Sequence, residues 1–151
     1  MRDELAREIT HRVRDACLCL HTQRAARALG RRFDEAFQPL GLTHGQFSLL
    51  MALNRPEPPT IGKVADFLAM DRTTLTANLK PLERRGLLAV AVDRADKRSR
   101  RLKLTAAGHR LLIRATPIWT RTHAEIERRL EGETPDRLRA DLKAIAVEPA
   151  R

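Results

Sequence analysis

The sequence predicts a mainly α-helical protein with one small β-hairpin, an α+β arrangement, and three observations support this fold class. Two short amphipathic segments follow each other at residues 60–68 and 71–85, each behind a residue suited to cap a helix. Two short strand-like segments, residues 88–92 and 100–104, flank a highly charged tip. Long stretches with helical periodicity lie on both sides of this central region.

Residues 3–38 are expected to form one long helix, because they contain no proline and Pro39 follows them. One apolar stripe runs along residues 5–20, and a second stripe lies on nearly the opposite side of the second half. The second stripe consists of Leu18, Ala25, Leu29, Phe33, Ala36 and Leu40. We therefore expect the first half to contact another subunit and the second half to pack on this chain's own core.

Thr43 and Gln46 have the Thr-x-x-Gln spacing of a capping box, which predicts a short helix after the turn at residues 41–42. A stiff proline-rich loop, residues 55–59, separates this helix from the next one. The residues of the short helix expected to face inward are Phe47, Leu50, Met51 and Leu53.

Thr60 and Asp71 are expected to be the N-caps of two helices joined by a tight turn at residues 69–70, and Gly86 ends the second helix. Leucines line the core face of that second helix. Its polar face carries short hydrogen-bonding side chains and cations, which are the types that reach base edges and phosphates in DNA. These candidates are Arg72, Thr73, Thr74, Thr76, Asn78 and Lys80.

Two helices followed by a basic hairpin form the layout of a winged helix-turn-helix, which places its second helix in the DNA major groove. The many cations at the hairpin tip suit a wing that lies along phosphates with one arginine in the minor groove. Asp93 and Asp96 are expected to hold arginines in one rotamer. Further DNA-contact candidates are Thr60, Arg94, Asp96, Lys97, Arg98 and Arg100.

Thr105 is expected to cap a helix that runs to about Leu130, and Thr134 with Pro135 starts a last helix. Both helices, like the N-terminal one, carry apolar faces that a single chain would leave uncovered.

These uncovered faces predict an obligate homodimer. Each chain, residues 1–151, is expected to form a single domain. Residues 41–108 would form the DNA-binding lobe, and residues 1–40 and 109–151 the helical dimerisation region. A two-fold dimer reads a pseudo-palindromic operator.

Three short motifs follow one another along the chain: Leu75-Thr76-x-x-Leu79-x-x-Leu82-Glu83-Arg84-Arg85-Gly86-Leu87, Asp93-x-x-Asp96-Lys97-Arg98, and Leu104-Thr105-x-x-Gly108. This pattern resembles the MarR family of bacterial transcriptional regulators over nearly the whole chain. The resemblance implies that residues 71–80 are the recognition helix, that Arg98 enters the minor groove, and that Asp96 orients it. It also implies a small anionic or aromatic effector between the DNA-binding lobe and the dimer helices. Members often carry a basic residue where this chain has Ala77, so base preference is not transferable.

The 151-residue chain has a formal net charge of +10 and a pI of about 11.1, which favours a polyanionic partner. No segment approaches the apolar length of a membrane span, and the charged first residues are unlike a signal peptide. With only two cysteines, a disulfide framework is excluded and a reducing compartment is expected. We therefore expect a cytoplasmic protein with no membrane partner.

No nucleotide-binding glycine loop, nucleophile elbow or zinc-protease motif is present, so we expect neither an enzyme nor a cofactor. Cys17 and His21 share a helix face but have no second ligand pair nearby, which disfavours a metal site. Cys17 and Cys19, two apart on a continuous helix, would point to different sides and not form a bridge within one chain. Some MarR relatives sense peroxides with a cysteine in this region supported by tyrosines, and this chain has no tyrosine.

We therefore expect a dimeric, sequence-specific regulator of transcription, a repressor, whose affinity for double-stranded DNA is modulated by a small-molecule effector. Arginines at positions 24, 27, 31 and 32 could meet an acidic effector or be solvated. One alternative is a thiol-based redox regulator that uses Cys17 or Cys19. Another, from a different class, is an architectural protein that coats DNA without an effector, which the helices outside the DNA-binding lobe disfavour.

Overall fold

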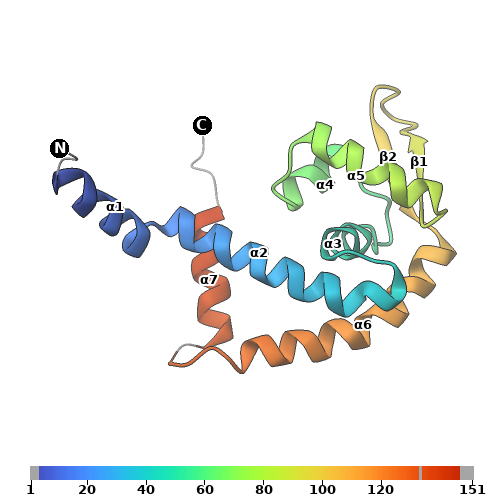
Figure 1. Cartoon of the computed structure of the whole chain (residues 1–151). Helices are drawn as coiled ribbons and strands as arrows, with labels where there is room; N and C mark the ends of the chain where they lie inside the picture. The colour runs from blue at the N-terminus through green and yellow to red at the C-terminus, as the bar shows by residue number, and fades with distance from the viewer. Residues whose placement is uncertain (1–3, 133, 147–151) are drawn as a thin grey trace.

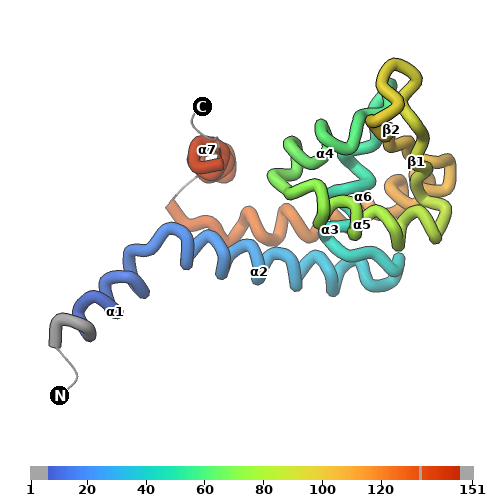
Figure 2. The backbone as a smooth tube through the Cα atoms, turned by 90° about the horizontal axis from the view of Figure 1, so that it is seen from above, coloured from blue at the N-terminus to red at the C-terminus, as the bar shows by residue number. Residues whose placement is uncertain are grey.

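The computed structural model describes residues 4–132 and 134–146, and this part folds into helices and one hairpin (Figure 1). The elements in chain order are α1 (Glu4–Ala16), α2 (Leu18–Phe37), the 3₁₀ helix η1 (Gln38–Leu40), α3 (His44–Ala52), α4 (Ile61–Phe67), α5 (Arg72–Arg84), β1 (Leu88–Val92), β2 (Arg100–Leu104), α6 (Ala106–Glu127) and α7 (Pro135–Ala146). A lobe of α3, α4, α5 and the hairpin lies at one end of the molecule, and α1 and α7 lie at the other (Figures 1 and 2). Helices α2 and α6 run side by side between the two ends.

The predicted long N-terminal helix is wrong, because the chain breaks it at Cys17. This residue has φ −74° and ψ 109°, and its Sγ accepts the backbone N–H of Leu20 at 3.4 Å, so that it caps α2. The break lies where the apolar stripe of the segment changes sides.

The core is centred on Phe37, which is fully buried at the end of α2. Its ring stacks on Phe33 and Phe47, with centroid separations of 5.8 and 4.7 Å. The predicted second stripe included Phe33 but omitted Phe37, and it included Leu18 and Leu29, which are 69% and 41% exposed. The face of α2 that packs on the core contains Phe33 and Phe37, which are four residues apart, and the predicted stripe was rotated away from this face.

The predicted caps of the lobe helices are confirmed. Thr43 and Gln46 form the capping box of α3, and the side chains of Thr60 and Asp71 accept backbone N–H groups at the starts of α4 and α5. Gly86 has φ +67°, the left-handed conformation expected after a helix end. On α5, the buried residues are Leu75, Leu79 and Leu82.

Met51 differs from its predicted inward position. It is 41% exposed, whereas Leu49, which was not predicted to be inward, is 2% exposed. Helix α3 packs against α2, α4 and α6, so its buried surface extends around more than one face. A single apolar stripe therefore does not describe this helix.

The hairpin has the predicted strands, paired antiparallel from Leu88 opposite Leu104 to Val92 opposite Arg100. Its base is tied to the loop before α4, because Thr60 forms a β-bridge with Arg101 and the Leu102 N–H donates to the Pro59 carbonyl at 2.9 Å. The hairpin is thus fixed relative to both short helices of the lobe.

Helix α6 begins at the predicted N-cap, Thr105, whose hydroxyl oxygen accepts the Gly108 N–H at 3.1 Å. It ends at Glu127, a few residues before the predicted end. Thr134 accepts the Arg137 N–H at 3.3 Å at the start of α7. Among the helices of the described part, none is long and apolar enough to cross a membrane.

Candidate nucleic-acid interface

The N-terminus of α5 is held by a side-chain cap. The two carboxylate oxygens of Asp71 accept the backbone N–H of Thr74 at 2.8 Å and its hydroxyl at 2.6 Å. The side-chain hydrogen bond from Thr74 is the main reason that the pKa of Asp71 lies below its usual value. The Thr74 hydroxyl is therefore used to start the helix, which separates Thr74 from the other predicted DNA contacts.

A shallow hollow of about 370 Å³ lies on the exposed side of α5 and brings four predicted contacts together. The residues that line it are Arg72, Thr73, Thr76, Ala77 and Lys80. The Thr76 hydroxyl donates to the Arg72 carbonyl at 2.7 Å within the helix. This hydrogen bond leaves the Thr76 methyl group, with that of Ala77, available for apolar contact with a base.

Asn78 lies apart from this hollow. Its amide nitrogen is 3.6 Å from the Met70 sulfur, and it lines a different hollow together with Gln46 of α3 and Pro81. The predicted set of six polar-face residues therefore divides, with Asn78 on the edge that faces α3.

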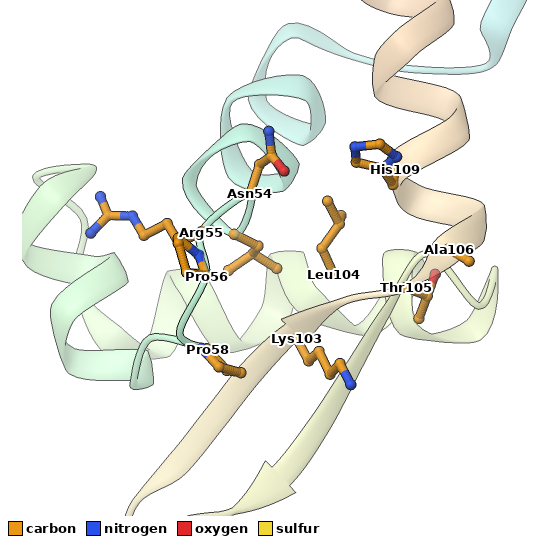
Figure 3. A pocket seen from close by; sticks show the side chains of 10 residues that line it. Asn54, Arg55, Pro56, Pro58, Lys103, Leu104, Thr105, Ala106 and His109 are labelled. Carbon is orange, nitrogen blue, oxygen red and sulfur yellow. The ribbon is translucent and has the colours of Figure 1, made fainter.

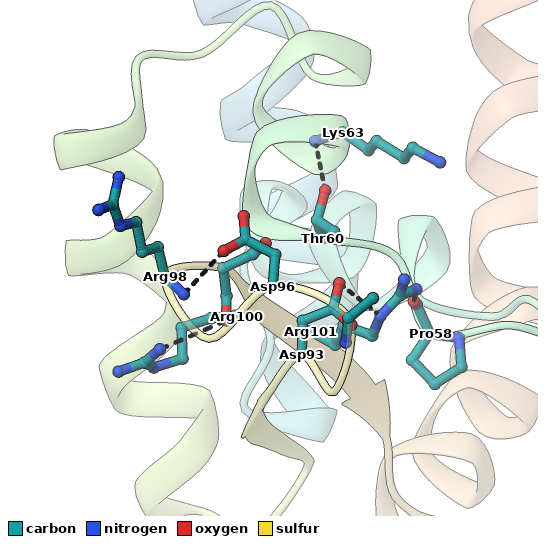
Figure 4. Close-up of polar contacts among 10 residues, drawn as sticks. Pro58, Thr60, Lys63, Asp93, Asp96, Arg98, Arg100 and Arg101 are labelled. Atoms are coloured by element: carbon teal, nitrogen blue, oxygen red, sulfur yellow. Dashed lines mark hydrogen bonds and ion pairs between the residues drawn. The ribbon is translucent and has the colours of Figure 1, made fainter.

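The wing tip is shaped by Asp96 (Figure 4). Its carboxylate accepts the backbone N–H of Arg98 at 3.0 Å, and its carbonyl accepts the Ser99 N–H at 2.9 Å. The family resemblance implied that Asp96 orients the Arg98 side chain, whereas here the carboxylate contacts the backbone and the guanidinium points away from it. Asp96 thus fixes the turn from which Arg98 projects.

The other predicted cations of the tip differ in their partners. Arg100 donates to the Lys97 and Ser99 carbonyls at 3.1 and 3.3 Å. For Arg94 and the side chain of Lys97, the described residues include no hydrogen-bond or ion-pair partner, and both are exposed. These side chains are free to meet phosphates.

The base of the wing contains a polar cluster, of which the Asp93 contact was predicted from the sequence. Asp93 is 7% exposed, accepts the Ala95 N–H at 3.0 Å and pairs with Arg101 Nε at 3.1 Å. The Arg101 hydrogen bond lowers the pKa of Asp93. Arg101 also donates to the Pro58 carbonyl at 2.8 Å. The prediction that Asp93 holds an arginine is confirmed, and that arginine supports the wing.

A larger hollow, of about 660 Å³, lies between α3, α4 and α6. Its lining is mainly apolar and consists of Phe47, Ser48, Met51, Ala52, Arg55, Phe67, Leu68, Thr116 and Trp119. The Arg55 guanidinium lies 5.3 Å from the centre of the Phe67 ring.

Figure 3 shows the loop of Arg55 beside a smaller hollow of about 300 Å³ that Lys103 and His109 also line. There the Arg55 side chain points away from His109.

Of the α2 arginines considered as effector contacts, Arg32 is paired with Glu125 at 2.8 Å. The cationic contact at the larger hollow thus comes from the loop before α4, a position that apolar periodicity does not indicate.

Two short capped helices, a braced basic hairpin and an exposed cationic helix face define a winged helix-turn-helix protein. The MarR family model matches residues 40–99. The chain is 30% identical over 101 residues to the organic hydroperoxide resistance transcriptional regulator of Bacillus subtilis (strain 168), covering 67% of this chain and 69% of that protein. The chain belongs to the MarR family.

Two further similarities agree with this assignment. The HTH-type transcriptional regulator TtmR of Methylorubrum extorquens (strain PA1) is 34% identical over 97 residues, which cover 64% of this chain and half (50%) of TtmR. The crystal structure of the M. tuberculosis transcriptional regulator MosR in complex with DNA has 37% sequence identity and a TM-score of 0.79, covering 86% of this chain and 93% of that one.

Proposed function

We propose that this protein is a homodimeric transcriptional regulator, a repressor, that recognises a pseudo-palindromic operator in double-stranded DNA. The observation that carries the proposal is the hollow on α5, where Arg72 and Lys80 flank short side chains suited to base edges. The wing beside it offers cations for the phosphates and the minor groove. Its place of action is the cytoplasm, where a regulator meets the chromosome.

Within this proposal, the α5 contacts divide into two kinds. Arg72, Thr73 and Thr76 read bases, and Lys80 binds phosphate. At the wing, Arg98 enters the minor groove, and the phosphate contacts are Thr60, Arg94, Lys97 and Arg100.

Selection of bound sequences from random double-stranded DNA tests this function. We expect a two-fold related site whose half-sites are centred about one helical turn apart. Binding that is equal on all sequences would instead identify an architectural coating protein.

We further propose that the hollow between α3, α4 and α6 binds a small aromatic carboxylate. Phe67 and Trp119 contribute aromatic rings to its lining, and Arg55, which lies over the Phe67 ring, offers a cation for the carboxylate. Helix α4 borders this hollow and packs directly on α5. An occupant that displaces α4 therefore changes the position of the recognition helix and lowers DNA affinity.

The sole tryptophan of the chain lines this hollow, so its fluorescence reports occupancy. We expect benzoate to change Trp119 emission and to weaken operator binding, and benzyl alcohol to do so much less. Arg55→Gln should weaken benzoate binding about tenfold or more, because a charge-assisted hydrogen bond is lost. Arg27→Gln on α2 is the matched control. Equal binding of both compounds by wild type and Arg55→Gln would contradict the carboxylate assignment.

A thiol switch is the second candidate function, and the break at Cys17 is the observation that favours it. Cys17 lies at the junction of α1 and α2 and not inside one continuous helix, and both cysteines are free thiols. The Cys17 sulfur also caps α2, and oxidation would remove this acceptor. Diamide treatment separates the two candidate functions. If the protein responds to an effector and not to thiol oxidation, wild type and Cys17→Ser should remain bound to DNA equally. If it is a thiol switch, only the wild type should release DNA.

A further inference from the structure

Arg72, the first residue of α5, extends its side chain over α4 and lies against Gly62. A Cβ atom built on Gly62 would be 2.9 Å from Arg72 Nη2 and 3.5 Å from Cζ. Such a contact is too close for real atoms, so the guanidinium occupies space that exists only because position 62 has no side chain.

Backbone conformation does not explain a glycine at this position. Gly62 is the second residue of α4 and, unlike Gly41 and Gly86, does not have a positive φ. A glycine inside a helix makes the helix less stable than an alanine does. The structure explains the glycine at position 62 by the room that it leaves for the Arg72 guanidinium.

Arg72 is also chemically available. Within residues 4–132 and 134–146, its guanidinium has no hydrogen-bond or ion-pair partner, whereas Arg85 donates to the Gly41 carbonyl and Arg101 pairs with Asp93. Its side chain lines the α5 hollow beside Thr76. An exposed, unpaired guanidinium is therefore held at the N-terminal end of the recognition helix.

We propose that Arg72 reads a guanine in each half-site and that Gly62 is the positioning residue that holds Arg72 in place for this contact. The proposal rests on the DNA-binding function proposed above. N-terminal residues of a recognition helix contact base edges, and a planar guanidinium matches the O6 and N7 acceptors of guanine. Packing on α4 restricts the side chain before DNA arrives, which reduces the ordering cost of binding.

The test compares two glycine-to-alanine variants. Gly45 is likewise the second residue of a short helix, α3, and a Cβ there would meet nothing within 4 Å. Gly62→Ala and Gly45→Ala should both fold with melting temperatures at or above that of wild type, because in the former only the flexible end of Arg72 must move. Gly45→Ala should select the wild-type site. Gly62→Ala should lose about tenfold of its preference for one G·C pair per half-site.

A double-mutant cycle shows whether Gly62 acts through Arg72. Arg72→Ala should lose the same base preference, and adding Gly62→Ala to it should change selectivity no further. A wild-type profile for Gly62→Ala overturns the inference. So does an even loss of affinity on all sequences with a smaller salt dependence, which would place Arg72 on a phosphate. A wild type that selects no sequence overturns the proposed function itself, whereas the other two outcomes leave it standing.

Discussion

At the scale of single residues, the Asp96 carboxylate combines two opposing effects on DNA binding. It shapes the wing tip by accepting the Arg98 backbone N–H, and in the proposed complex it would place a negative charge beside the DNA phosphates. Asp96→Asn keeps a side-chain acceptor and removes the charge, so we expect operator affinity equal to or higher than that of wild type. Asp96→Ala removes both, and should bind about fivefold more weakly than Asp96→Asn, since one hydrogen bond contributes about 1 kcal/mol.

Fluorescence anisotropy with labelled operator at two salt concentrations measures both variants. The asparagine variant is the control for charge, because the two substitutions change the net charge equally. Identical affinities for Asp96→Asn and Asp96→Ala would show that the tip turn does not depend on this contact.

The residue types at the interface could be predicted from the sequence, but the division of their roles could not. Helical spacing placed Thr76 and Asn78 on one polar face. In the structure Asn78 turns toward Met70, in the turn that joins α4 to α5, while Thr76 lines the exposed hollow, and this division depends on tertiary neighbours that helical spacing does not show. The role of Arg101 depends on Pro58, 43 residues earlier in the chain, so no local pattern indicates it.

At the scale of elements, caps and strands were predictable because they depend on neighbouring residues. Thr43, Thr60, Asp71 and Thr105 each accept a backbone N–H three residues ahead, and such spacing is visible in a sequence. The break at Cys17 was not, because it involves neither proline nor glycine. The only sign of the break in the sequence is that the apolar stripe changes sides near residue 17.

Gly108 explains why the Leu-Thr-x-x-Gly motif ends in glycine. A Cβ atom at Gly108 would overlap the Leu87 backbone carbonyl oxygen and lie 2.7 Å from Leu104 Cδ1. Unlike a flexible arginine, this backbone cannot yield without moving the hairpin relative to α6. We expect Gly108→Ala to lower the free energy of unfolding by about 1–3 kcal/mol, as overpacking does. Denaturant titration followed by circular dichroism measures it.

Gly45→Ala is again the control, because added volume there meets nothing and helix propensity increases. Gly108→Ala with wild-type stability would mean that the wing and α6 shift together without cost. Unchanged DNA affinity in that variant would further show that the wing angle tolerates the shift.

At the scale of the whole molecule, the described single chain leaves large apolar side chains exposed at the end opposite the DNA-binding lobe. Ile9 and Val13 on α1 are 54% and 50% exposed. On α7, Leu138, Leu142 and Ile145 are 39%, 43% and 59% exposed. Apolar faces of this kind gathered at one end of a small protein mark an association surface. We propose that α1 and α7, with adjoining parts of α2 and α6, form the dimer interface.

Truncation and substitution both test the dimer. Each large apolar side chain buried at the interface should contribute about 1.5–3 kcal/mol, so the Leu138→Ser, Leu142→Ser double variant should weaken dimerisation about a hundredfold or more. Deleting residues 1–13 should lower stability and DNA affinity together, because one subunit reads only half a site. Ile113→Ser is the control, since this α6 residue is 59% exposed but lies outside the α1 and α7 faces.

Equilibrium ultracentrifugation of the wild type without DNA, at low micromolar concentration, should give the dimer mass. A monomer mass with fully formed helices would contradict the homodimer and, with it, the pseudo-palindromic operator.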